Sequence, residues 1–372
     1  MSNCKEFKEF KELIKYVREY NDDKYNNCFN IFKKWVIPVE ITETEKQNIH
    51  NIYTNHCNNN NKYPYLFKYV DDFVDKLLPY AEALGISKDC NNLRDKTSIA
   101  SSILLYYGSL VYKYHFDSPN SALDDLYEYT ILYILMDQYI DDINLNDSIK
   151  DIAIIQMTLL INDPYKYKDL QLIDPILKHM TIIYIKLMDK YPNIKQSIIN
   201  IFMAQIKGHK KQKLKTLPRE DYYTVASEKG GYTIQVLIHF FMINEEKHIK
   251  DSFDMGVIVQ LIDDCADVKE DRINNIYTTS LYDLDKKGYL DDIFIDIMEK
   301  INNLDNKYNV IKILLTYNLL MVVSKNPVLY SSRLKQLIEP YNLFKYINDE
   351  VGLKYLSEYI LKYIQEKLKS NQ

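Results

Sequence analysis

The sequence predicts an all-α fold, and three observations support this prediction. Apolar residues recur three and four positions apart in one segment after another, as they do on the buried face of an α-helix. Glycine and proline, with 8 and 10 residues among 372, are both well below average usage, which favours long helices over turn-rich β-sheets. Strict alternation of apolar and polar residues, typical of half-buried strands, does not extend over a whole segment.

The expected helices follow one another along most of the chain, with about ten to twelve in one large domain. They occupy residues 66–84, 97–115, 122–141, 149–162, 172–190, 194–210, 232–244, 252–271, 291–302, 308–324 and 351–369. Turn-forming residues separate them at 56–64, 116–120, 162–164, 191–193, 217–221, 325–327 and 339–340. The asparagine run at 58–61 predicts a boundary between an N-terminal helical extension, residues 1–60, and a core domain, residues 61–372.

Charge and cysteine usage exclude several classes of protein. A net charge of −5 and a pI of about 5.9 do not suit a nucleic-acid-binding protein, and the short basic stretch KGHKKQKLK at 207–215 is expected to be a solvated helix end. Five cysteines without CxxC spacing indicate free thiols in a reducing compartment, so we expect a cytoplasmic protein. Neither an apolar leader nor an apolar run near the roughly 20 residues of a membrane span is present, so no stable membrane anchor is expected.

One segment combines a core-like helix with a cluster of carboxylates. In VIVQLIDDCADVKEDR, residues 257–272, an apolar run leads directly into the acidic residues. On a helix, Asp263, Asp267 and Asp271 lie one above another, and such like-charge pairs cost a few tenths of a kcal/mol each even when exposed. A cation would relieve this repulsion, and a set of oxygen ligands without histidine or cysteine favours Mg²⁺ over zinc. The alternative is a solvated acidic helix end.

A second segment has the same design. YTILYILMDQYIDD, residues 129–142, is an apolar stretch that ends in Asp137, Asp141 and Asp142. Two such helices are expected if they face each other across one cavity mouth and share metal ions. An EF-hand beginning at Asp142 is disfavoured, because Asp147 stands where that loop needs glycine. The motifs GxxxxGK[ST], GxGxxG, GxSxG and HExxH are absent from the sequence, and its seven histidines are scattered.

These two segments resemble the Asp-rich motifs of the class I terpenoid synthases, over roughly residues 95–350. Asp137 and Asp141 fit the first motif in its DxxxD form, which squalene and phytoene synthases use. The acidic residues at 263–271 fit the spacing of the cyclases' second motif, the QxxDDxxD motif of elongating synthases with Gln260, and the DxxED motif of squalene synthase. The resemblance implies a helical barrel around an apolar pocket, with about three Mg²⁺ ions held by Asp137, Asp141, Asp142, Asp263, Asp264, Asp267 and Asp271.

The same resemblance implies residues that bind the substrate diphosphate. The stretch at 217–236 is similar to the kinked helix that precedes the second motif, and the adjacent Gly230 and Gly231 indicate a helix break or a C-cap. Lys229 stands where elongating enzymes carry a diphosphate lysine, and Arg219 is a substitute for the cyclases' sensor arginine. The remaining candidates are Arg272, which ends a segment similar to one in large-prenyl cyclases, and the pair Lys345 and Tyr346.

The resemblance therefore implies a terpene synthase or cyclase that ionises an allylic prenyl diphosphate with Mg²⁺. Elongating enzymes need a second diphosphate site whose segments the sequence lacks, and squalene synthases usually carry a membrane tail. A trans-prenyl diphosphate synthase and a squalene/phytoene synthase-like prenyltransferase remain as alternatives, as does a non-catalytic all-α scaffold that binds a partner. Tyr133, Tyr232 and Phe240 are candidates to stabilise a carbocation. The expected partner is the prenyl diphosphate substrate, without nucleic acid, and a homodimer stays open.

Overall fold

The structure, a computed structural model, describes residues 23–36, the single positions 125, 128, 129, 132, 133, 136, 139 and 140, and residues 145–163, 166–167, 175–240 and 246–341. The described residues form helices joined by short turns and contain no strand, which confirms the predicted all-α class for them. The predicted helices at 66–84, 97–115 and 351–369 lie outside the described residues. So does the predicted boundary at residue 60, which stays a prediction.

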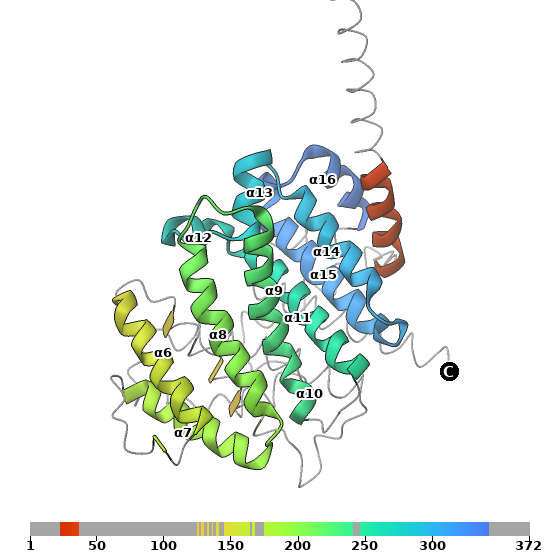
Figure 1. Cartoon of the computed structure of the whole chain (residues 1–372). Helices are drawn as coiled ribbons and strands as arrows, with labels where there is room; N and C mark the ends of the chain where they lie inside the picture. Colours follow the sequence, from red (N-terminus) through yellow and green to blue (C-terminus); the bar gives the residue numbers. More distant parts are fainter. Residues whose placement is uncertain are drawn as a thin grey trace, which may run out of the picture. The chain divides into compact units, whose positions relative to one another are not determined.

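The chain divides into two compact units, one of residues 1–54 with 282–372 and the other of residues 55–281. The second unit contains both acidic segments. Its labelled helices are α6 (Asp147–Asn162), α7 (Pro175–Lys190), α8 (Ile194–Gln212), α9 (Arg219–Gln235), α10 (Leu237–Phe240), α11 (Glu246–Ala266) and α12 (Val268–Asn274). In Figure 1, α6 lies against α7 and α8, α8 lies against α9, and α9 crosses α11.

In the other unit, a buried aspartate connects segments that are far apart in the sequence. Its elements are a helix at 23–35, the C-terminal part of α13 (Thr279–Lys287), α14 (Asp291–Asn303), α15 (Asn309–Lys325), α16 (Ser332–Ile338), and 3-10 turns at Asn306–Tyr308, Pro327–Leu329 and Glu339–Tyr341. Asp291 accepts hydrogen bonds from the Tyr25 hydroxyl and, at 2.9 Å, from the backbone N–H of Ser331. These bonds join residues that are far apart in the sequence.

The helix boundaries differ from the predicted ones around α9 and α11, and the helices α13 and α16 were not predicted. The stretch at 217–221 was expected to be a break, yet α9 begins at Arg219, directly after Pro218, with Glu220 and Asp221 in its first turn. Proline and carboxylates favour a helix start, so the same residues that indicated a break in fact mark an N-terminus. The predicted helix at 252–271 begins earlier, at Glu246, and is interrupted at Asp267.

Gly230 and Gly231 neither break nor cap the helix, which corrects both interpretations of this pair. The helix α9 continues through both residues and ends at Gln235, and α10 begins at Leu237. A Cβ atom on Gly230 would lie within 3.0 Å of the Gly256 carbonyl oxygen, and one on Gly231 would meet the Phe253 ring equally closely. The glycines therefore allow α9 and α11 to pack backbone against backbone.

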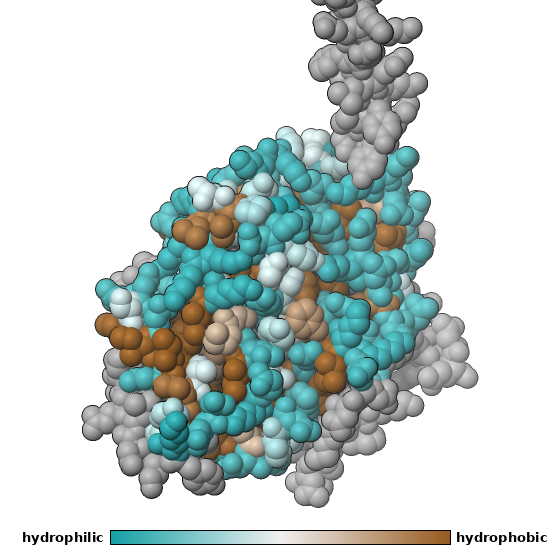
Figure 2. All heavy atoms as spheres, viewed as in Figure 1, coloured by the Kyte–Doolittle hydropathy of each residue, from teal (hydrophilic) through white to brown (hydrophobic). Residues whose placement is uncertain are grey.

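The helix α6 has apolar residues on its exposed face as well as on its buried face. In Figure 2, brown side chains gather over the position that α6 occupies in Figure 1, and those exposed on this helix are Ile149, Ile152, Ile155 and Leu159. In the part of the chain that the structure describes, no helix has the length and apolarity to cross a membrane.

Candidate functional site

The acidic cluster begins at the C-terminal end of α11 and continues into α12. Asp263 and Asp267 are exposed, Asp271 is half-buried, and Asp264 is buried and accepts a 2.9 Å hydrogen bond from the Gln260 side chain. The helix is interrupted at Asp267, but the N–H of Asp267 still bonds to the Asp263 carbonyl and the N–H of Asp271 to the Asp267 carbonyl, both at 2.9 Å. The aspartates at 263, 267 and 271 therefore remain on successive turns, as the sequence predicted.

The carboxyl group of Asp271 is strongly perturbed by its surroundings. Burial and the nearby charges of Asp264, Asp267 and Asp263 raise its pKa to about 9, from an ordinary value of 3.8. Its buried Oδ2 atom has no hydrogen-bond partner among the described residues. Crowded carboxylates with an unsatisfied buried oxygen form a site where a hard cation would relieve both the repulsion and the missing contact.

Lys229 of α9 lies beside this cluster. Its side chain is buried, and its positive charge acts to lower the pKa of Asp271, opposing the effect of the carboxylates. The contact between Gly230 and Gly256 sets how closely α9 approaches α11, and Gly230 is the next residue along from Lys229. The structure therefore brings Lys229 together with the second acidic motif, across the crossing of these two helices.

The first acidic motif lies outside the described residues at Asp137, Asp141 and Asp142, but its helix is described on both sides of Asp137. Tyr129, Met136 and Ile140 are buried and helical. The Tyr129 hydroxyl donates a 3.0 Å hydrogen bond to the carbonyl oxygen of Thr233, at the C-terminal end of α9. The Thr233 hydroxyl in turn donates to the carbonyl of Lys229 at 2.7 Å.

The described contacts give the direction of this first-motif helix. Asp125, the first described residue of this helix, accepts hydrogen bonds from Lys190 and, at 2.7 Å, from the Tyr191 hydroxyl, which both lie just before the N-terminus of α8. Shortly after its end, Asp147 pairs with His209, at 3.0 Å, and with Lys213, at the C-terminus of α8. The helix therefore runs along α8 in the same direction, from the N-terminal to the C-terminal end.

The second motif belongs to that same end of the unit. The N–H of Tyr277, a few residues beyond Asp271, donates a 2.6 Å hydrogen bond to the carbonyl of Gln212, the last residue of α8. Figure 1 shows α12 close to this end of α8. The described neighbours of both acidic motifs thus converge on the C-terminal end of α8, as a site shared between the two motifs requires.

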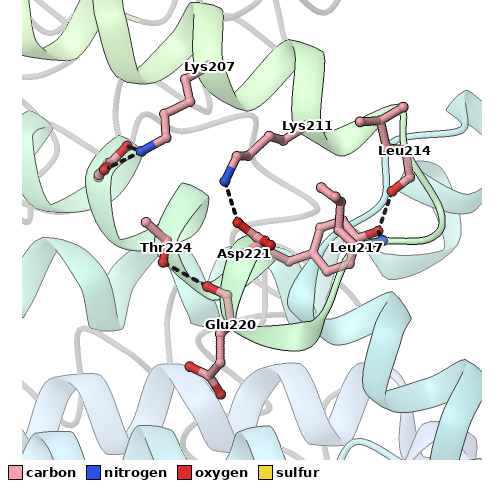
Figure 3. Close-up of polar contacts among 9 residues, drawn as sticks. Lys207, Lys211, Leu214, Leu217, Glu220, Asp221 and Thr224 are labelled. Atoms are coloured by element: carbon pink, nitrogen blue, oxygen red, sulfur yellow. Dashed lines mark hydrogen bonds and ion pairs between the residues drawn. The ribbon is translucent and has the colours of Figure 1, made fainter.

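The basic stretch at 207–215 is paired within the protein, so the expected solvated helix end is only partly right. Figure 3 shows the contacts between α8 and α9, in which Lys207 bonds to Glu228 at 2.6 Å and Lys211 bonds to Asp221. The Tyr222 hydroxyl bonds to the backbone of the connecting loop, at Leu214 and Leu217. Lys210 pairs with Asp151 and Lys213 with Asp147, while Lys215 donates a hydrogen bond to the Asn275 side chain. The His209 ring, whose pKa is lowered by burial, hydrogen-bonds to Asp147.

The other predicted site residues are more dispersed. Arg219 is half-buried at the start of α9, and Arg272 is exposed directly after Asp271. Lys345 and Tyr346 lie outside the described residues. Among the aromatic candidates, Tyr133 is half-buried, Tyr232 packs edge-on against Phe253 with ring centroids 5.3 Å apart, and Phe240 is fully buried between Tyr129 and Tyr191.

Two residues with polar contacts near the first motif escaped the sequence reasoning. One is Tyr129, whose position in an apolar segment gave no sign of its hydrogen bond to Thr233. The other is Lys150, a lysine on the buried face of α6 whose ammonium group donates a 2.6 Å hydrogen bond to the Ile140 carbonyl. A signal was available for Lys150, because it precedes the buried Ala153, Ile154 and Met157 at i+3, i+4 and i+7. A lysine on the buried face of a helix is unusual, and it indicates that its ammonium group has a hydrogen-bond or ion-pair partner.

No group of three or more His, Cys, Asp or Glu side chains has the geometry of a metal site within the described residues alone. The predicted ligands of the first motif are outside these residues. The oxygen-only donors and the unsatisfied Asp271 carboxyl group nevertheless fit a hard cation. No protein-family model matches the sequence, and a comparison with the curated proteins also finds no match.

Proposed function

We propose that this protein is a class I terpene synthase that ionises a single allylic prenyl diphosphate and forms a terpene without a co-substrate. The observation that carries the proposal is the crowded carboxylate cluster around Asp271, with Lys229 beside it, at the end of the unit where the first-motif helix is also directed. Such a concentration of carboxylates would be costly unless positive charge balanced it. The sequence resemblance supplies the class of reaction.

Each side chain of the site has a role that its position supports. When bound, Mg²⁺ ions supply positive charge that binds the diphosphate and stabilises the charge it gains as it leaves. Asp263, Asp267 and Asp271, which lie on successive helical turns, would bind these ions through their carboxylate oxygens. The ammonium group of Lys229 is close enough to Asp271 for its charge to lower the pKa of that carboxyl group, and it is suited to bind a diphosphate oxygen.

Departure of the diphosphate leaves an allylic cation, which must be kept from water until it reacts. Aromatic faces attract such a cation, and Tyr133 and Tyr232 come from the two helices that Tyr129 joins. Ring closure and loss of a proton would then give a cyclic hydrocarbon, whereas capture of water would give an alcohol. We also propose that the helices form a barrel and that the protein acts in the cytoplasm.

The experiment that tests the proposal supplies purified protein with Mg²⁺ and prenyl diphosphates of increasing chain length, with and without isopentenyl diphosphate. We expect release of diphosphate and formation of a terpene from a single allylic substrate. Product that forms only with isopentenyl diphosphate would replace the cyclase proposal by chain elongation. If no prenyl diphosphate is consumed at any chain length, the proposed function is wrong.

A further inference from the structure

The buried charge of Lys150 has no part in the reaction proposed above. The side chain is 2 % exposed, and its Nζ atom donates a 2.6 Å hydrogen bond to the carbonyl oxygen of Ile140. A lysine is rarely this buried unless a partner compensates for its lost hydration. The bond to Ile140 provides such a partner, and it joins α6 to the helix that carries the first acidic motif.

The bond from Lys150 holds the backbone at Ile140, which lies within the first acidic motif in the sequence. Ile140 directly precedes Asp141 and follows Asp137 by three residues, and its own side chain is fully buried. Carbonyl groups near the C-terminal end of a helix carry partial negative charge, which the motif's carboxylates increase, and a cation there is stabilising. The lysine therefore both anchors this backbone and offsets negative charge next to the motif.

The helix that presents Lys150 is itself fixed. Asp147, one turn before Lys150, pairs with His209 at 3.0 Å and with Lys213, and Asp151 pairs with Lys210 at 3.0 Å. All three basic partners lie at the C-terminal end of α8 or directly after it. Through α6, the ammonium group is thus held in place relative to α8.

We propose that Lys150 is a positioning residue, which holds the backbone at Ile140 so that the first acidic motif can bind metal. The inference rests on the proposed function, because only there does the motif bind metal. In this role Lys150 acts through its bond to the Ile140 carbonyl and not as a ligand of the cation or the substrate. Loss of the lysine should therefore weaken metal binding and not only the fold.

The test compares Lys150→Met with Lys312→Met as a matched control. Lys312 is also buried and also donates to a backbone carbonyl, that of Asn302 at 3.1 Å, but it lies in the other unit. Binding of Mn²⁺ in the presence of inorganic diphosphate is measured by electron paramagnetic resonance, and folding is measured by circular dichroism. Supporting groups around metal ligands contribute about 10- to 100-fold in affinity, so we expect a loss of that size in Lys150→Met. Lys312→Met should lower the melting temperature but retain the parent's Mn²⁺ affinity.

The outcomes separate this inference from the proposed function. Parent protein that binds no Mn²⁺ with diphosphate overturns both. Parent protein that binds, with a folded Lys150→Met variant of equal affinity, overturns only the role of Lys150. Should Lys150→Met fail to fold, Lys150→Arg carries the test, because arginine keeps the charge but places its N–H groups differently. A folded Lys150→Arg variant with unchanged Mn²⁺ affinity would then refute the inference, and a weakened affinity would support it.

Discussion

Gly230 of α9 and Gly256 of α11 are in direct backbone contact where the two helices cross. A Cβ atom on either residue would lie within 3.0 Å of the other's carbonyl oxygen, a distance that real Cβ atoms essentially never show. The crossing lies next to Lys229 in the sequence and two turns before the acidic end of α11. Two positions without side chains therefore set the separation between the lysine and the carboxylates.

Replacing Gly256 by alanine should force α9 and α11 apart. We expect a loss of about 1–3 kcal/mol in the free energy of unfolding, as for other overpacked contacts, even though alanine favours helix formation. The measurement is urea unfolding followed by circular dichroism. Gly208→Ala on α8 is the control, because its Cβ would meet side chains and not backbone, Val225 at 3.1 Å and Gln212 at 3.6 Å. A Gly256→Ala variant as stable as Gly208→Ala would contradict the close crossing.

Asp271→Asn should stabilise the metal-free protein, and by more at higher pH. The pKa of Asp271 is about 9 in the folded protein, whereas the unfolded chain has the ordinary value of 3.8. The unfolded chain thus loses this proton first, and the parent loses stability as pH rises from about 4 to about 9. Asparagine carries no such charge. Unfolding at pH 5 and pH 8 should show the variant's advantage growing with pH, and an advantage independent of pH would refute this assignment.

The fold class was predictable because helical periodicity depends on local spacing, which the described helices α6, α8, α14 and α15 follow to within a few residues. Residues 219–231 of α9 were missed, because the buried ones include Lys229, Gly230 and only a few large apolar side chains. The acidic residues were found from charge and spacing alone. What the sequence could not provide was the long-range pairing of Lys150 with Ile140 and of Tyr129 with Thr233, which depends on how the helices pack.

Mg²⁺ and inorganic diphosphate together should raise the melting temperature by more than the sum of their separate effects. Each ligand completes part of the other's binding site if both motifs share the ions, and a ligand that binds only the folded state stabilises it. Differential scanning fluorimetry with each ligand, with both and with neither provides the measurement. Purely additive shifts, or none, would exclude a shared site.

The most direct measurement is the turnover of Asp263→Ala on the best allylic prenyl diphosphate. Asp254→Ala is the matched control, because Asp254 lies on the same helix and pairs with Lys250 at 2.7 Å. Asp147→Ala is a less suitable control, since Asp147 joins α6 to His209 and Lys213 at the end of α8, whereas the pair of Asp254 with Lys250 lies within one helix. If Asp263 binds the catalytic metal, its loss should remove about 3–4 kcal/mol of transition-state stabilisation and slow turnover about 10²- to 10³-fold, while Asp254→Ala stays near the parent. Turnover of a folded Asp263→Ala variant that equals that of Asp254→Ala would contradict the account.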